Sequence, residues 1–191
     1  IAKDFFSEGF NIEILNLSMN KIFLIEREAF KNLNILVKLD LSNNLLSHLH
    51  SNTFQSLSKL QILNISFNLV KYIYSNLLSN LHSLLYLDIS YNQLVLIEDY
   101  SFGNLLYLED LHIEFNMNLT KILTNKTFYG IRGIKKIFTS ENLFRSDFQN
   151  LIKIKDVITP KLLENNMNTE YYYSINLVSL VHTNLHFKRI D

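Results

Sequence analysis

The sequence predicts an α/β solenoid, in which similar short units stack and each unit contributes one parallel β-strand. Two sets of residues recur in phase with each other, with a period of 24 through Asn116 in the first set and through Phe102 in the second. The first set is the asparagine of a Leu/Ile-x-x-Asn segment, at Asn20, Asn44, Asn68, Asn92 and Asn116. The second set pairs an aromatic residue or leucine with an apolar residue three positions later, beginning at Phe30, Phe54, Leu78, Phe102, Phe128 and Phe148. One unit cannot bury its own leucines, so the units are expected to stack around one continuous core.

Each unit is expected to form a short strand followed by a turn. In Leu39-Asp40-Leu41, apolar residues alternate with a polar one, so one face of the strand is buried and the other is wet. The asparagine suits the turn because its amide both donates and accepts hydrogen bonds and can satisfy backbone groups inside the core. The aromatic positions, starting at Phe6, are expected to stack as a spine in the convex half of the solenoid.

Written out, the unit L-x-x-L-x-L-x-x-N-x-L-x-x-I-x-x-x-x-F-x-x-L-x-x resembles the leucine-rich-repeat family. Its phenylalanine makes it similar to the 24-residue class of extracellular animal proteins, such as Toll-like receptors and Slit-like or chaoptin-like ectodomains. The resemblance covers residues 1 to about 160. It implies a horseshoe with the strands on its concave face and an irregular or 3-10 helical convex side. Because Ile1 and Phe6 lie one period before Ile25 and Phe30, the chain starts in mid-repeat and is expected to be a fragment.

The spacing changes in the last repeats. The fifth repeat is two residues longer than the others, with an insertion around residues 117–125, and the sixth is four residues shorter. Thr139 stands in the sixth repeat where leucine is expected, and Pro160 cannot donate an amide hydrogen to a strand ladder. We therefore expect a solenoid of about six repeats over residues 1–160 and a C-terminal cap or tail over residues 161–191.

Composition excludes several classes of function. Eighteen basic and eighteen acidic side chains cancel, so nucleic acid is not an expected partner. The chain has no cysteine and no apolar run of about 18 residues, so we expect neither a thiolate metal site nor direct membrane insertion by this segment. It also has no phosphate-binding loop, nucleophile elbow or paired carboxylates with a cleft signature, so neither an enzyme nor a cofactor is expected.

Binding is expected on the concave face, where parallel stacking places equivalent outward residues in columns. A further column is expected to face outward beside them and consists of Ser18, Ser42, Ser66, Ser90, Glu114 and Ser140. The residues predicted to contact a ligand on this face are Lys38, Asp40, Ile62, Asn64, Phe67, Tyr86, Asp88, Tyr91, Asp110, His112, Glu114 and Phe115.

Each group also has a plainer interpretation. The aromatic residues Phe67, Tyr91 and Phe115 suit a binding hot spot, but also simple packing at the strand edge. Asp88, Asp110, His112, Glu114 and Glu109 suit a charged recognition patch better than a cation site, so no metal is predicted. The pairs His48/His50 and His182/His186 are interpreted as surface histidines because neither has a third ligand nearby in sequence.

Four Asn-x-Ser/Thr sequons bear on localisation. Asn118 and Asn125 lie in the enlarged loop and are predicted to carry glycans, whereas glycans on Asn16 or Asn64 would cover the concave face. The favoured function is recognition of a protein ligand or co-receptor by an extracellular or cell-surface receptor or adhesion glycoprotein. A homo- or heterodimer is compatible with this function. An intracellular scaffold in the cytoplasm is the alternative, and an enzyme with an attached repeat domain is a third hypothesis.

Overall fold

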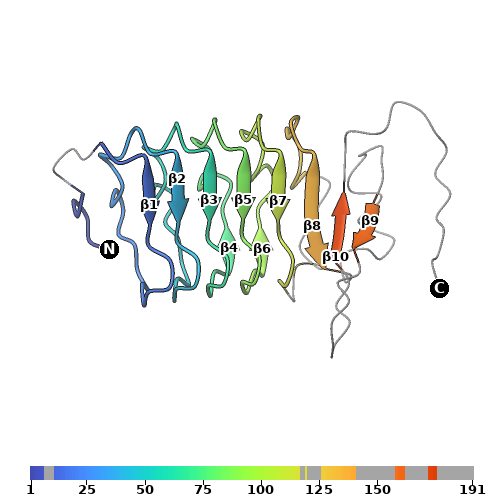
Figure 1. Cartoon of the computed structure of the whole chain (residues 1–191), viewed down its shortest axis with the longest axis horizontal. Coiled ribbons are helices and arrows are strands. Elements are labelled where there is room, and N and C mark those ends of the chain that lie inside the picture. Colours follow the sequence, from blue (N-terminus) through green and yellow to red (C-terminus); the bar gives the residue numbers. More distant parts are fainter. Residues whose placement is uncertain (7–10, 117–118, 120–125, 141–157, 162–171, 176–191) are drawn as a thin grey trace.

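The computed structural model describes residues 1–6, 11–116, 119, 126–140, 158–161 and 172–175. Its main element is an eight-stranded sheet with the order β1-β2-β3-β5-β7-β8-β10-β9 (Figure 1). The strands of this sheet are β1 Ile14–Asn16, β2 Lys38–Asp40, β3 Ile62–Asn64, β5 Tyr86–Asp88, β7 Asp110–His112, β8 Lys136–Ser140, β9 Ile158–Lys161 and β10 Tyr172–Ile175. A separate two-stranded sheet joins β4 Tyr72–Ile73 to β6 Leu96–Ile97.

The first six strands of the main sheet are parallel and one repeat apart, as the 24-residue period predicts. The central apolar residues of neighbouring strands are register partners, from Leu15 beside Leu39 to Leu111 beside Ile137. The central residues from Leu39 to Ile137 are fully buried. The prediction of one short parallel strand per repeat is therefore confirmed.

The turn asparagines form a ladder along the stack. Asn68 Nδ2 donates to Ile65 O and Ser66 O of its own repeat at 3.1 Å, and to Leu41 O of the preceding repeat at 3.0 Å. Asn68 Oδ1 accepts from Leu46 N at 3.0 Å. Asn44, Asn92 and Asn116 repeat this pattern, so each of these asparagines joins two turns that would otherwise leave polar groups unpaired in the core.

The predicted aromatic spine is present. The rings of Phe6 and Phe30 stack at 6.0 Å between centroids, those of Phe30 and Phe54 at 6.3 Å, and those of Phe102 and Phe128 at 5.6 Å. Leu78, which takes the aromatic position in the repeat between those of Phe54 and Phe102, is fully buried. Phe148 lies outside the described residues.

The convex half consists of turns. Of the two forms that the resemblance implied, irregular and 3-10 helical, the irregular form is the one observed. Its backbone bonds join residues three apart, such as Leu33 N to Phe30 O at 3.0 Å, and no α-helix occurs in the described ranges. The β4–β6 sheet was not predicted; it pairs the buried Ile73 with the buried Ile97. The described part of the chain contains no helix that is long and apolar enough to cross a membrane.

The parallel arrangement ends after β8. Strand β10 pairs antiparallel with β8, and β9 pairs antiparallel with β10 at the edge of the sheet. Pro160 lies in this edge strand, where a missing amide hydrogen is tolerated. Strand β9 includes the expected boundary between residues 160 and 161, and the division into a solenoid and a cap stays a prediction.

Candidate functional site

The outward face of the parallel sheet, here called the sheet face, is the surface expected to be concave. The register places Lys38, Ile62, Tyr86 and Asp110 in one column and Asp40, Asn64, Asp88 and His112 in the next, as predicted. Lys38 is exposed, and the other seven side chains are half-buried. All eight therefore lie where a partner can reach them.

The serine column departs from the prediction. Ser42, Ser66 and Ser90 are 6%, 4% and 2% exposed, so the expectation that they line the open surface is wrong. Their backbone amides donate to the Oδ1 atom two residues earlier, as Ser90 N does to Asp88 at 2.9 Å. The hydroxyl of Ser90 donates to the same atom at 2.6 Å. These bonds turn the chain inward directly after the strand, which buries the serine.

Glu114 takes the serine position in the fifth repeat and is 7% exposed, so the expectation that it faces outward is also wrong. Its Oε1 lies 3.2 Å from Nδ1 of His112, two residues earlier. In the serine repeats the later residue donates and the earlier side chain accepts. Here the earlier residue, His112, supplies the donor and the later residue, Glu114, supplies the acceptor. Oε2 of Glu114 is buried without a hydrogen-bond partner.

Tyr86, Asp88, Asp110 and His112 form a compact square on β5 and β7. Tyr86 is the register partner of Asp110, and Asp88 is the register partner of His112. The rings of Tyr86 and His112 meet across one diagonal at 5.0 Å between centroids, and the two carboxylates lie on the other diagonal. Burial raises the pKa of the Tyr86 phenol, and the negative charges of Asp88, Glu114 and Asp110 raise this pKa further. The square therefore has a negative potential.

Phe67, Tyr91 and Phe115 form a continuous row of rings beside the strands. Phe67 stacks on Tyr91 at 4.1 Å and Tyr91 on Phe115 at 4.0 Å between centroids. Phe67 is 47% exposed and the other two rings are half-buried. All three residues have left-handed backbone conformations, with φ of 52°, 49° and 55°. Asparagine, which occupies this position as Asn43, adopts that conformation at a lower cost than an aromatic residue.

The other predicted features are not part of these groups. Glu109 is paired with Lys135, whose Nζ lies 2.7 Å from Oε2. The rings of His48 and His50 meet edge to face at 5.0 Å. The described ranges contain no group of three or more His, Cys, Asp or Glu residues that could hold a metal ion. The sequons at Asn118 and Asn125, and His182 and His186, lie outside the described residues.

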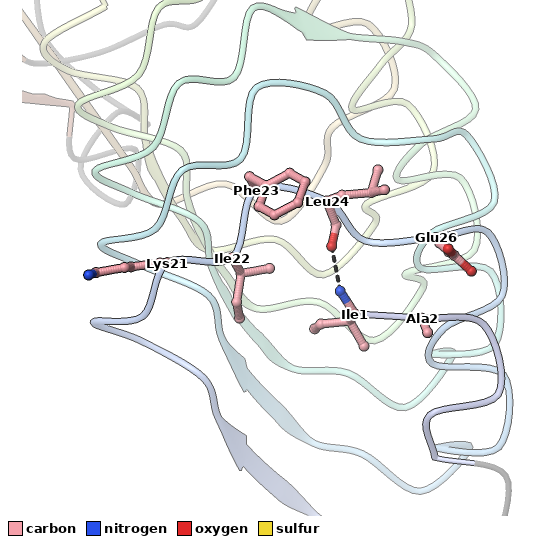
Figure 2. Close-up of a pocket in the computed structure, with 7 residues that line it drawn as sticks. All are labelled: Ile1, Ala2, Lys21, Ile22, Phe23, Leu24 and Glu26. Atoms are coloured by element: carbon pink, nitrogen blue, oxygen red, sulfur yellow. Dashed lines mark hydrogen bonds between the residues drawn. The ribbon is translucent and has the colours of Figure 1, made fainter.

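A pocket of about 280 Å³ lies away from the sheet face, next to the first residues of the chain (Figure 2). It is lined by residues 21–24 together with Ile1, Ala2 and Glu26. The amino group of Ile1 donates to Leu24 O across this pocket. The lining contains no predicted site residue.

The stacked parallel strands, the asparagine ladder and the phenylalanine spine define a leucine-rich-repeat solenoid. Models of the leucine-rich repeat match residues 10–70 and 36–94, and a model of the BspA-type leucine-rich repeat region matches residues 71–191. The chain belongs to the leucine-rich-repeat family.

Among solved structures, the chain is similar to a protein in the crystal structure of the TLR13-ssRNA13 complex, with 27% sequence identity and a TM-score of 0.60. The similarity covers 65% of this chain but 18% of the other chain, so the present chain spans less than a fifth of that structure. A comparison with curated protein sequences finds no significant match.

Proposed function

We propose that this chain is a recognition module of a cell-surface or secreted receptor or adhesion protein, and that it binds a protein ligand or co-receptor on the sheet face. The observation that carries the proposal is the row of half-exposed rings of Phe67, Tyr91 and Phe115 beside the charged square on β5 and β7. Aromatic side chains next to polar groups are typical anchors of protein interfaces. Lys38, Asp40, Ile62 and Asn64 extend the same face across β2 and β3.

The left-handed backbone of the aromatic row adds support. A bulky residue in this conformation costs on the order of 1 kcal/mol. Three successive repeats accept this cost at Phe67, Tyr91 and Phe115. Strand-edge packing explains the stacking of the rings on one another, whereas a binding role also explains why Phe67 is 47% exposed.

Single-stranded nucleic acid is the second candidate ligand, because the similar structure is titled as a complex of TLR13 with ssRNA13. Stacked rings can bind bases. Asp88, Asp110 and Glu114 would repel the phosphates of such a ligand on this face, and the chain has no net positive charge. We therefore favour a protein ligand and propose no catalytic role.

Selection of a displayed random peptide library against the whole chain tests the proposal. Binding of the selected peptides is measured for two double variants. One carries Tyr86→Ala and Tyr91→Ala on the sheet face, and the control carries Tyr100→Ala and Tyr129→Ala. The control removes a pair of contacting tyrosines from the convex turns, whose ring centroids are 5.6 Å apart. We expect the sheet-face pair to lose affinity at least tenfold, because interface hot spots contribute about 2 kcal/mol or more. Equal losses in both pairs would place binding elsewhere.

Localisation is tested by the intact mass of the protein from its native cell, before and after removal of N-linked glycans. Glycans on Asn118 or Asn125 would support an extracellular or cell-surface glycoprotein, and bare sequons would support the cytoplasmic scaffold. A glycan on Asn64 would contradict the proposed binding face, because Asn64 lies in the middle of it. Sedimentation of the purified chain distinguishes a monomer from a homodimer.

A further inference from the structure

The square on β5 and β7 combines two kinds of chemistry in one place. The rings of Tyr86 and His112 lie on one diagonal, and the carboxylates of Asp88 and Asp110 lie on the other. His112 also stacks on Phe138 at 4.0 Å between centroids, which extends the ring surface toward β8. A group that complements this square is positively charged and can contact aromatic rings.

The two carboxylates of the square differ from Glu109 because they lack a basic partner among the described residues. In the described part of the chain, neither Asp88 nor Asp110 forms an ion pair with lysine or arginine. Glu109, directly before β7, does have such a partner in Lys135 at 2.7 Å. Lys136 is the register partner of Asp110 on β8 but does not lie within ion-pair distance of it, whereas the neighbouring Glu109 is paired with Lys135.

Glu114 is a second and independent observation beside the square. Its side chain is 10% exposed, one of its oxygens contacts His112, and the other is buried with no partner. Burial of a carboxylate with an unpaired oxygen is costly in a low-dielectric site. A cation held over Tyr86 and His112 would lower this cost through space, without touching Glu114.

We infer that the square binds an arginine side chain of a protein ligand; this inference rests on the proposed function. A guanidinium group is planar, so it stacks on aromatic rings and also offers a fork of donors to carboxylates. A lysine ammonium is a point charge without the planar face, and it fits the square less well. A phosphate would be repelled by both carboxylates.

The test uses three fluorescent peptides of one extended sequence, which carry arginine, lysine or the neutral analogue citrulline at the same positions. A short single-stranded RNA is the fourth probe. Each probe is titrated by fluorescence anisotropy into the whole chain and into the Asp88→Asn, Asp110→Asn double variant. Asp88→Asn preserves the fold, because Asn64 makes the same turn, accepting from Ser66 N at 2.9 Å.

The matched control is Glu13→Gln, which removes an exposed carboxylate directly before β1, at the position that Gln61 takes before β3. The arginine peptide should bind to the unchanged chain and to the control equally. It should bind to the double variant about tenfold more weakly or worse, because hydrogen bonds to charged groups are stronger than neutral ones. The lysine peptide should bind less tightly than the arginine peptide, and the citrulline peptide should not bind.

The outcomes separate this inference from the proposed function. Equal binding of the arginine and citrulline peptides, or equal losses in the control and the double variant, would overturn the arginine site. The proposed function would then still stand if the selected peptides lose affinity in the Tyr86, Tyr91 variant. Binding of the RNA that strengthens in the double variant would assign the face to nucleic acid, and would overturn both.

Discussion

Replacing Asn68 with leucine tests the asparagine ladder that joins the turns. The side chain of Asn68 is 5% exposed and makes four hydrogen bonds, to Leu46 N and to the carbonyl oxygens of Leu41, Ile65 and Ser66. Leucine has a similar volume and can make none of these bonds. The substitution therefore removes hydrogen bonding from the core and leaves little change in packing.

The four bonds are not equivalent. The amide of Leu46 loses the partner shown for it, and a buried unpaired donor costs about 1–3 kcal/mol. The three carbonyl oxygens each keep a second donor, from Asn44 Nδ2, Asn92 Nδ2 and Asn43 N, so the loss is about 0.5 kcal/mol for each of them. We expect Asn68→Leu to reduce the free energy of unfolding by about 3 kcal/mol.

Urea denaturation followed by circular dichroism measures this loss. The matched control is Asn20→Leu, at the same position of the first repeat, where the side chain is exposed and donates only to Leu17 O and Ser18 O in the structure. Water replaces those bonds, so its loss should stay below about 1 kcal/mol. Asn43→Leu, one residue before a ladder asparagine, should also cost less than Asn68→Leu. Similar losses for Asn68→Leu and Asn20→Leu would refute the ladder as the source of stability.

Two further predictions concern backbone conformation and pH. Gly130→Ala should destabilise the chain by more than about 1 kcal/mol, since Gly130 has a φ of 97° and its added Cβ would lie 2.8 Å from Gly103 O. Gly103→Ala, whose closest contacts would be 3.2 Å, should cost less in the same urea titration. Because the folded pKa of Tyr86 is raised, its contribution to stability is present below the unfolded pKa of about 10 and is lost above it. Tyr86→Phe should therefore reduce the fall in urea midpoint above about pH 10, and an unchanged fall would contradict the raised pKa.

The sheet register could be predicted from the sequence because one period fixes it. Once Leu39 and Leu63 are equivalent, parallel stacking makes Asp40 and Asn64 neighbours, and the structure confirms this pairing. The same reasoning places His112 beside Asp88. These columns require no knowledge of side-chain conformation, since they depend only on equal spacing along the chain.

Features beyond the strands could not be predicted in this way. Strand β2 ends at Asp40, and the alternation of burial continues only to the buried Leu41, so extending it to Ser42 gave the wrong burial. The β4–β6 sheet has two residues in each strand, which is too short for an alternating pattern. The diagonal contact between Tyr86 and His112 depends on side-chain rotamers, which a single sequence does not specify.

The fifth repeat breaks a local rule that the four repeats before it obey. In those repeats a serine, at Ser18, Ser42, Ser66 and Ser90, donates to the side chain two residues earlier, whereas His112 and Glu114 exchange the roles of donor and acceptor. The exchange keeps one bond but buries a carboxylate oxygen without a partner. Folding alone would favour the serine arrangement, and departures of this kind are expected where a protein gives up stability for function.

This interpretation makes opposite predictions for stability and for binding. The double variant His112→Asn, Glu114→Ser copies the uncharged Asn64 and Ser66, and should raise the free energy of unfolding by about 1 kcal/mol because no carboxylate oxygen remains buried and unpaired. Glu114→Gln, which keeps the volume and an acceptor but removes the charge, should weaken the arginine peptide. If the double variant is less stable than the unchanged chain and Glu114→Gln binds the peptide normally, then Glu114 serves packing in the fifth repeat, and the negative potential of the square comes from Asp88 and Asp110 alone.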